Sequence, residues 1–532
     1  MAITLGLVEA IDSNGVYVTM PGSRGVLRGP YRSLSTVAAG TTVLVASTDD
    51  GEQVVVGPAP GGDGTVNVLS FGAVGDGVTD DTAAVQSAMT AGVGKVVLFP
   101  AGYTFVLSSA VTVSSQTSVF GYGATVKGVT KHVPCFDIVQ GEDITVRGLK
   151  FLTTITRTYT GGTTQRGADI ATMWCGIYVS GSRITIRDCS FSGFTSGLTV
   201  TKWDGADMTG DADHILVQNC QVDTVDFGVL CDATDNLTVH GLSGSYVGQS
   251  GWGAPPHLFY ASGGAALRTS TNLTVTDVRG FDSPDGHCVQ IKDTVGAVVS
   301  QITTDGCDEG LLSLDNSTQV SISTLSYRSA EMPAACVYLQ AGCEDVSLSD
   351  ISIIAGTAAS GKRAGRIAGS RITASGLRVQ TTWEVDAQWE WYVLGDDITI
   401  SGVWSQSLGS YSPYVFGIDG TNEGASTNIH VSNVTAPNCY SSGCVRIFGD
   451  VTGSIELDSD RVAALVNASG LTNTVRITTF GDVLTHPGTY VGFFGTAPIT
   501  KPTVTGSRGG NAALASLLTE LANLGLITDS SS

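Results

Sequence analysis

Residues 320–325 (VSISTL), 346–351 (VSLSDI) and 372–377 (ITASGL) decide the fold, because they repeat one short pattern. Each stretch has an apolar, a polar and an apolar residue, then two polar or glycine residues, then a final apolar residue. Such alternation is typical of a β-strand with one buried face. The three copies begin 26 residues apart, whereas a propeller blade would need about 40 residues. The pattern therefore predicts a solenoid built from short strands.

The same unit recurs from about residue 119 to residue 480, so most of the chain belongs to the solenoid. Successive copies begin 22 to 40 residues apart, and spacings near 22–26 are typical of a right-handed, single-stranded parallel β-helix. The 11 cysteines include no CxxC pair, and Cys189 and Cys220 take the same place in consecutive copies, which predicts reduced, buried, stacked thiols. The apolar positions are Ile144/Val146/Leu149, Ile184/Ile186/Cys189, Ile215/Val217/Cys220, Leu237/Val239/Leu242, Leu273/Val275/Val278, Ala297/Val299/Ile302, Val320/Ile322/Leu325, Val346/Leu348/Ile351, Ile372/Ala374/Leu377, Ile398/Ile400/Val403 and Ile429/Val431/Val434.

Composition limits the classes of function that the chain can have. Only 14% of the 532 residues are charged and the formal net charge is −21, so nucleic acid is not expected as a partner. The chain begins MAITL, without the basic and apolar segments of a signal peptide, and no window of 18 apolar residues predicts a membrane span. We therefore expect synthesis in a host cytoplasm and release by another route.

Two different modules flank the solenoid. Residues 1–58 contain alternating segments and the hairpin turn DDG, which predicts a small β-barrel of five or six strands. Residues 59–66 form a linker by composition, the β-helix is expected over 67–480, and a C-terminal β/loop segment over 481–510. Residues 511–532 are expected to hold a short helix, which is marginal alone and would be stabilised by two copies of itself in a homotrimer. Its leucines are spaced by three and four: Leu514, Leu517, Leu521 and Leu524.

A local motif opens the solenoid. Residues 67–89 (NVLSFGAVGDGVTDDTAAVQSAM) predict a strand, a glycine-rich turn and a capping helix over 79–90. Thr79 would be the N-cap, with Asp80 and Asp81 in the first turn, where the helix dipole favours them. This stretch strongly resembles the opening of the pectate-lyase-like superfamily of parallel β-helices, in which the helix covers the end of the solenoid.

A second resemblance lies at the C-terminus. The run at 509–530 (GGNAALASLLTELANLGLITDS) resembles the C-terminal tails of actinobacteriophage minor tail proteins. Together the two resemblances imply a phage tailspike carried on the tail of the virion. Residues 1–58 would then bind tail or baseplate proteins, and the β-helix would bind host surface polysaccharide.

Carboxylates recur at similar offsets in neighbouring repeats. Asp285 and Asp308 each precede the next strand by six residues, and Glu309 follows Asp308. Rungs of a β-helix lie about 4.8 Å apart, and two carboxylates about 5 Å apart suit a retaining glycosidase. We therefore predict Asp285, Asp308 and Glu309 as catalytic residues of a polysaccharide hydrolase, with Asp226 and Glu331 binding substrate. A plain alternative is that aspartates stabilise the turns of the solenoid.

Other functions are compatible with the same residues. The segments 282–286 (DSPDG) and 306–310 (GCDEG) loosely resemble the polygalacturonase pattern, but no Gly-His-Gly or Arg-Ile-Lys follows, so pectin hydrolysis is not supported. A lyase would need a base, for which Lys292 and Arg268 are available. A non-catalytic glycan-binding adhesin or a structural tail protein would use the same fold, so these alternatives stay open.

Long repeats indicate insertions, which form loops on one face of a solenoid. The 36-residue repeat and an earlier 31-residue repeat carry Trp203, Trp252 and Tyr260, whose rings suit the apolar face of a sugar. We predict that these three residues bind substrate together with Asp282 and His287. The seven histidines show no HxxxH or HExxH spacing, so no metal or cofactor is predicted, although Ca²⁺ stays open. A second aromatic patch comprises Trp383, Trp389, Trp391 and Tyr392 with Glu384, Asp386 and Glu390.

Overall fold

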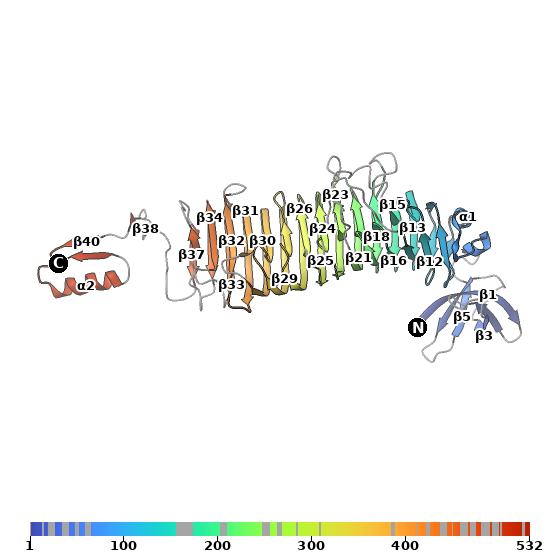
Figure 1. Ribbon diagram of the computed structural model, residues 1–532, viewed down its shortest axis with the longest axis horizontal. Helices are drawn as coiled ribbons and strands as arrows, with labels where there is room; N and C mark the ends of the chain where they lie inside the picture. Colours follow the sequence, from blue (N-terminus) through green and yellow to red (C-terminus); the bar gives the residue numbers. More distant parts are fainter. Residues whose placement is uncertain are drawn as a thin grey trace.

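The computed structural model shows an elongated stack of β-strands with a short helix, α1, at its N-terminal end (Figure 1). Within the described residues the solenoid strands join into one 32-stranded sheet, and its inter-turn pairs are parallel. The prediction of an all-β, right-handed parallel β-helix is confirmed. The described residues are 2–12, 15–19, 27–33, 42–47, 53–58, 65–155, 174–202, 210–246, 256–262, 269–283, 286–307, 310–384, 389–411, 413–421, 426–436, 444–449, 451–457, 466–468, 475–479, 490–491, 499–500, 503–523 and 527–531.

The solenoid runs from β6 to β37. Its first elements are β6 (Thr65–Asn67), η1 (Val68–Phe71), β7 (Asp76–Asp80), α1 (Thr82–Ala91), β8 (Val96–Leu98), β9 (Thr104–Leu107), β10 (Val111–Thr112), β11 (Ser118–Phe120) and β12 (Thr125–Gly128). The middle turns contain β13 (Phe136–Arg147), β14 (Lys150–Thr153), β15 (Cys175–Arg187), β16 (Ser190–Ser192), β17 (Ser196–Thr201), β18 (Asp213–Gln218), β19 (Gln221–Val225), β20 (Phe227–Asp232), β21 (Asp235–Tyr246), β22 (His257–Ser262), β23 (Ser270–Phe281), β24 (Val289–Lys292), β25 (Thr294–Asp305) and β26 (Leu312–Asp315). The last turns contain β27 (Thr318–Glu331), β28 (Val337–Leu339), β29 (Glu344–Ala358), β30 (Gly365–Trp383), β31 (Trp389–Ser407), β32 (Tyr414–Gly420), β33 (Ser426–Thr435), β34 (Val445–Gly449), β35 (Val451–Leu457), β36 (Val466–Ala468) and β37 (Val475–Thr479).

The strand register reproduces the sequence repeat. Val320 pairs with Val346, and Val346 pairs with Ile372, so the first apolar position of each copy stacks on the same position in the next. The third position follows, because Ile322 pairs with Leu348. The period of the sequence is therefore the period of the solenoid.

Each of these turns has a tight corner formed by one residue in the left-handed region. Its φ lies between 52° and 77°, a conformation that glycine, asparagine and aspartate adopt at the lowest cost. Turn geometry alone therefore explains Asp188, Asp277 and Asp350, none of which is a predicted site residue. The corner residues are Gly148, Asp188, Asn219, Gly241, Asp277, Gln301, Thr324, Asp350, Gly376, Gly402 and Asn433.

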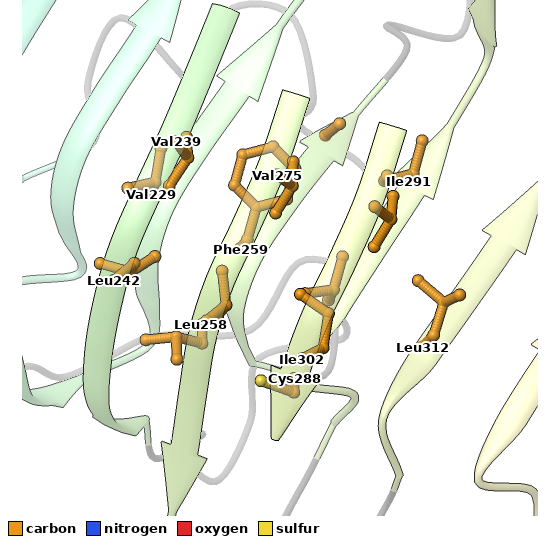
Figure 2. Packing of buried hydrophobic residues seen from close by; sticks show 14 of the residues in the cluster. Val229, Val239, Leu242, Leu258, Phe259, Val275, Cys288, Ile291, Ile302 and Leu312 are labelled. Atoms are coloured by element: carbon orange, nitrogen blue, oxygen red, sulfur yellow. The ribbon is translucent and has the colours of Figure 1, made fainter. Parts of the chain in front are cut away.

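Apolar side chains from successive turns fill the interior. Figure 2 shows Val229, Phe259 and Ile291 within this packing, and none of them is more than 1% exposed. Full burial of one such side chain contributes about 1.5–3 kcal/mol. Each turn therefore adds its own share to the stability of the stack.

Cysteines contribute to the same core. Nine described cysteines are free and buried, and burial raises the pKa of the Cys189 and Cys220 thiols, so they stay protonated at neutral pH. The prediction of reduced, buried thiols is confirmed for these nine. It is wrong for Cys444, which forms a disulfide bond.

The helix α1 packs its buried side chains, Val85, Ala88 and Met89, against the first turn of the solenoid. It spans Thr82–Ala91, so the predicted start at Thr79 is wrong. Thr79 instead lies in β7, where the backbone is extended.

The two aspartates before α1 have different roles from those predicted. Asp80 accepts a hydrogen bond from the backbone N–H of Thr82 at 3.0 Å. Asp81 is buried, and its carboxylate accepts from the backbone N–H groups of Val74 at 2.6 Å and Val106 at 3.3 Å. Asp81 therefore connects the glycine-rich turn to β9 instead of lying in the first turn of the helix.

The predicted modules at both ends of the chain form. Residues 1–58 hold β1 (Ala2–Asp12), β2 (Gly15–Thr19), β3 (Leu27–Ser33), β4 (Thr42–Ser47) and β5 (Gln53–Pro58), which close into a barrel in the order β1-β2-β3-β5-β4. After the solenoid come β38 (Tyr490–Val491), β39 (Ile499–Thr500), β40 (Thr503–Gly506), α2 (Ala512–Asn523) and β41 (Thr528–Ser531). No helix among the described residues is long and apolar enough to cross a membrane.

The leucines of α2 differ in exposure. Leu514 is 39% exposed and Leu517 is 56% exposed, whereas Leu518 is buried. Leu521 is half-buried, and Leu524 lies outside the described residues. The helix therefore presents apolar side chains to solvent within a single chain.

Candidate functional site

The 32-stranded sheet folds into several faces, and the face formed by β20, β22, β24, β26, β28, β30, β31, β32 and β34 is called the front sheet. It carries a row of residues in register that point away from the core, which we call the front ladder. The first four members of the row are buried, whereas its later side chains, such as Tyr338 and Arg366, are half-buried. Successive residues of a strand point to opposite faces, so the neighbours of these residues on the same strands point into the core. At about 4.8 Å per rung, the row is roughly 38 Å long and could accommodate an extended polymer. Its members, in register from β20 to β34, are Leu230, Tyr260, Gln290, Ser313, Tyr338, Arg366, Tyr392, Gly417 and Arg446.

An aromatic cluster lies where β20, β22 and β24 begin. The Tyr260 ring centroid is 5.4 Å from that of Phe227 and 5.1 Å from that of His257, and none of the three residues is more than 6% exposed. The His287 ring lies 6.3 Å from that of His257. We call Phe227, His257, Tyr260 and His287 the histidine corner.

The two imidazoles of this corner are uncharged at neutral pH. Burial, together with the neighbouring His287, lowers the pKa of His257 to about 3, and burial lowers the pKa of His287 to about 4. Nδ1 of His257 lies 2.9 Å from the carbonyl oxygen of His287 and 3.1 Å from its backbone nitrogen, so the backbone of His287 holds this ring whether Nδ1 donates or accepts. The corner therefore offers hydrogen-bonding groups without adding charge.

Gly310 fixes how the next turn passes the histidine corner. Its φ is +135°, and a Cβ atom here would lie 2.7 Å from the carbonyl oxygen of Ala335 and 3.1 Å from Cδ2 of His287. Only glycine fits this position without strain. The chain that enters β26 thus passes directly against the His287 ring.

The three predicted catalytic residues, Asp285, Asp308 and Glu309, lie outside the described residues. The flanking strands are in register, because Val289 of β24 pairs with Leu312 of β26. Asp285 stands four residues before Val289, and Asp308 stands four residues before Leu312. The two acidic segments therefore enter neighbouring rungs at equal offsets in the sequence.

The predicted binding residues fall into three groups. Trp203 and Trp252 lie outside the described residues. Asp226 is fully buried, and its carbonyl oxygen accepts from the backbone N–H of His257 at 3.0 Å, so it belongs to the wall of the histidine corner. His287 and Tyr260 belong to the same corner, where Tyr260 is only 6% exposed.

Among the described residues, no contact is found between Asp282 or Glu331 and this corner. Asp282 has a φ of 49° and is an exposed turn residue directly after β23. Glu331 is exposed at the end of β27, and its backbone carbonyl accepts from the Tyr327 hydroxyl at 3.1 Å. The structure thus brings Asp226, Tyr260 and His287 together and leaves these two residues apart.

Charged groups lie beside the front ladder. Lys292, a candidate base for a lyase, has its Nζ atom 3.8 Å from Oδ2 of Asp315 on the next rung. Arg268, the other candidate base, lies outside the described residues. The described lysine is therefore engaged in an ion pair.

The second predicted aromatic patch divides between core and surface. Trp383 and Trp391 are buried, whereas Trp389 and Tyr392 are half-buried on the front sheet. Sequence reasoning missed the arginines around them, Arg363, Arg366 and Arg446. The sequence does contain a signal for them, because Arg366 and Arg446 occupy equivalent positions in different turns.

A separate groove of about 750 Å³ lies on another sheet, formed by β16, β19, β21 and β23. It is hollow because serine and glycine occupy adjacent rungs where longer side chains would fill the space. Asp223 in its wall accepts hydrogen bonds from the hydroxyls of Thr224 and Ser245 at 3.1 and 3.2 Å. No predicted site residue is among its lining residues, which are Ser190, Phe191, Ser192, Asn219, Gln221, Val222, Asp223, Gly241, Ser243, Gly244, Asp277, Arg279 and Phe281.

These features define the class of protein: it is a parallel β-helix whose front sheet carries the front ladder. A family model described as "Rhamnogalacturonase A/epimerase, pectate lyase-like" matches residues 65–312. This segment runs from the first strand of the solenoid into β26 and includes the histidine corner. No curated protein sequence matches the chain.

Solved structures with a similar architecture come from different organisms. The N-terminal fragment of gene product 12 of bacteriophage Phi29 is 14% identical, with a TM-score of 0.41, covering 83% of this chain and 74% of that one. PfbA, a surface adhesin of Streptococcus pneumoniae, is 13% identical, with a TM-score of 0.40, covering 70% of this chain and 91% of that one. The A-module of the mannuronan C-5 epimerase AlgE6 of Azotobacter vinelandii is 12% identical, with a TM-score of 0.35, covering 79% and 100%. At these values the likeness says nothing about activity.

Proposed function

We propose that the chain is a phage tailspike, or minor tail protein, that binds a host surface polysaccharide along its front ladder. The ladder itself is the main support: from Tyr260 to Tyr392, six aromatic, amide, hydroxyl and guanidinium side chains follow one another in register over roughly 24 Å, at about one group per 4.8 Å. Tyrosine rings suit the apolar faces of sugars, and the polar groups suit their hydroxyls. The match of residues 65–312 to a pectate-lyase-like family model agrees with a carbohydrate ligand.

We further propose that Asp285, Asp308 and Glu309 hydrolyse the bound polysaccharide. The equal offsets of Asp285 and Asp308 from paired strand residues support this, because acids on neighbouring rungs suit glycoside hydrolysis. One acid would protonate the leaving oxygen, and the other would act as nucleophile or activate water. The imidazole of His287, which is uncharged, would then bind a sugar hydroxyl without adding a positive charge beside the catalytic carboxyl groups.

The test is release of new reducing ends when purified full-length protein is incubated with host envelope polysaccharides. Asp285→Asn, Asp308→Asn and Glu309→Gln keep the side-chain shape but cannot transfer a proton, so at least one should lower turnover by about 10²–10⁴-fold. Asp350→Asn, at an exposed left-handed corner that asparagine also tolerates, is the matched control and should keep wild-type turnover. If all three amide variants turn over like the wild type, the catalytic assignment is wrong.

A non-catalytic adhesin is the second candidate, and the burial of Tyr260 and His257 favours it because a packed corner leaves little room for chemistry. Glycan binding with no reducing ends from any envelope polysaccharide would support this candidate and exclude the hydrolase. If no glycan is bound at all, the chain would be a structural tail protein.

We also propose how the tailspike is assembled. The barrel of residues 1–58 would bind tail or baseplate proteins of the virion. The exposed Leu514 and Leu517 of α2 would be covered by two further copies of the chain in a homotrimer.

A further inference from the structure

Three arginines gather on the C-terminal part of the front ladder. Tyr338 pairs with Arg366, Arg366 pairs with Tyr392, and Arg446 follows on the same row, two rungs beyond Tyr392. Arg363 lies just before β30, and its guanidinium is 5.6 Å from the Tyr392 ring centroid. These positions lie after residue 312, beyond the segment that the family model matches.

Trp389 is the centre of this patch. The guanidinium carbons of Arg363 and Arg446 each lie 6.0 Å from its ring centroid, so the indole lies within reach of two cations. Phe448 packs against it with ring centroids 5.4 Å apart and lies 4.6 Å from the Arg446 guanidinium. We call Arg363, Arg366, Trp389, Tyr392, Arg446 and Phe448 the arginine–aromatic patch.

The backbone is adapted to hold the indole on the sheet. Gly417 follows Tyr392 on the front ladder, and a Cβ atom there would lie 2.9 Å from Cγ of Trp389. Any other residue would displace the ring or shift the backbone. Trp389 is therefore a platform that lies directly over the front sheet.

Arg363 and Arg446 differ from other arginines in their partners, and the carboxylate that contacts the patch, Asp419, accepts a hydrogen bond from the Tyr392 hydroxyl. Arg371, on a different part of β30, binds Asp345 at 2.6 Å and Glu344 at 2.8 Å. By contrast, within the described part of the chain neither Arg363 nor Arg446 forms an ion pair. Burial is the main cause that lowers the pKa of Arg363, and the nearby Arg366 adds to it, so this cation is partly removed from solvent. In a chain of net charge −21, such a cluster indicates an anionic ligand.

We propose that the arginine–aromatic patch is a binding subsite for an acidic polysaccharide, whose carboxylate groups contact Arg363 and Arg446 while a sugar ring lies on Trp389. This inference rests on the proposed function of the front ladder as a glycan surface and names the chemical class of that glycan. Guanidinium groups bind carboxylates through paired, charge-assisted hydrogen bonds. The ring platform between the two arginines adds contact with the apolar face of the sugar.

The test measures binding of the full-length protein to polygalacturonate, hyaluronate, dextran and a single-stranded oligothymidylate by affinity electrophoresis. The wild type should bind at least one of the two acidic polysaccharides, and binding should weaken with added salt. Arg363→Gln and Arg446→Gln should each raise the dissociation constant roughly tenfold, as expected for the loss of one charge-assisted contact. Arg378→Gln is the matched control, because the Arg378 guanidinium lies 4.5 Å from the Trp404 ring but on another sheet, and it should not change the dissociation constant.

Each other outcome overturns the inference in a distinct way. Binding of dextran alone, or of an acidic polysaccharide with unchanged affinity in both variants, would reject the patch but leave glycan binding by the front ladder in place. Tighter binding of the oligothymidylate than of either acidic polysaccharide would make the patch a site for single-stranded nucleic acid, since arginine and aromatic side chains also stack on bases. Binding of no polymer by the wild type would reject both the patch and the proposed function.

Discussion

Replacing Glu390 with glutamine should make the stability of the solenoid less dependent on pH. Glu390 is fully buried in β31, where Nε1–H of Trp383 donates to its carboxyl at 3.3 Å. Burial raises the pKa of this carboxyl to about 8, although hydrogen bonds from Ser405 and Trp383 act in the opposite direction. The folded protein therefore keeps a proton at pH 7 that the unfolded chain loses.

The sign and size of the effect follow from this pKa. The pKa of Glu390 in the folded protein lies above the ordinary value of 4.5. The contribution of this carboxyl to the free energy of unfolding is therefore fully present only below pH 4.5, and it is lost as the pH rises through 8. The interval from 4.5 to 8, at about 1.36 kcal/mol for each pKa unit, corresponds to about 5 kcal/mol. About 4 kcal/mol of this loss falls between pH 5 and pH 9.

Guanidinium unfolding followed by circular dichroism at pH 5 and pH 9 measures the difference. The wild type should lose about 4 kcal/mol more than Glu390→Gln between the two conditions. Glu384→Gln, an exposed substitution directly after β30, is the control and should follow the wild type. If wild type and Glu390→Gln lose the same free energy, Glu390 is not a buried protonated carboxyl and the reasoning is refuted.

Three further predictions concern assembly and packing. A chain ending at Gly509 should be monomeric by light scattering while the full chain is trimeric; equal masses per particle would exclude α2 as the trimer contact. A chain starting at Thr65 should keep the strand signal of the solenoid in circular dichroism, and its loss would mean that the barrel is needed for folding. Gly310→Ala should lower the free energy of unfolding by about 1–3 kcal/mol through strain against Ala335 and His287, whereas Gly361→Ala, with the same sign of φ but open space, should cost less.

The fold could be predicted because its main determinant is repeated in the sequence. The pairing of Val320, Val346 and Ile372 depends on which residues are apolar and how far apart they lie, and both are visible without a structure. The start of α1 could not be predicted in the same way. Asp81 is drawn to the backbone of Val74 and Val106 by the fold of the first turn, and a local capping preference contains no information about that contact.

The candidate site was less predictable, because exposure depends on residues distant in sequence. Tyr260 lies in a long repeat, which indicates a surface loop, yet its ring packs against Phe227 of the neighbouring turn and His257 of its own strand, β22. Arg363 and Arg446 are 83 residues apart, and only the register of β30 to β34 shows that both reach one indole ring. The spacing of residues in the sequence therefore predicts the register position of a residue on the solenoid, but it does not predict how deeply its side chain is buried.

The two kinds of corner in the solenoid have unequal capacity for change. At a left-handed corner, a single residue turns the chain from one segment to the next. The connection that leads into the front sheet varies in length: one residue separates β19 from β20, and ten residues separate β21 from β22. Insertions at the second kind lengthen a loop without altering which apolar residues stack. New ligand preferences can therefore arise by exchanging or extending these loops beside the front ladder, while the stack beneath them folds as before. A lineage that must follow a changing cell-surface polymer would gain from a scaffold that confines its variation to one edge.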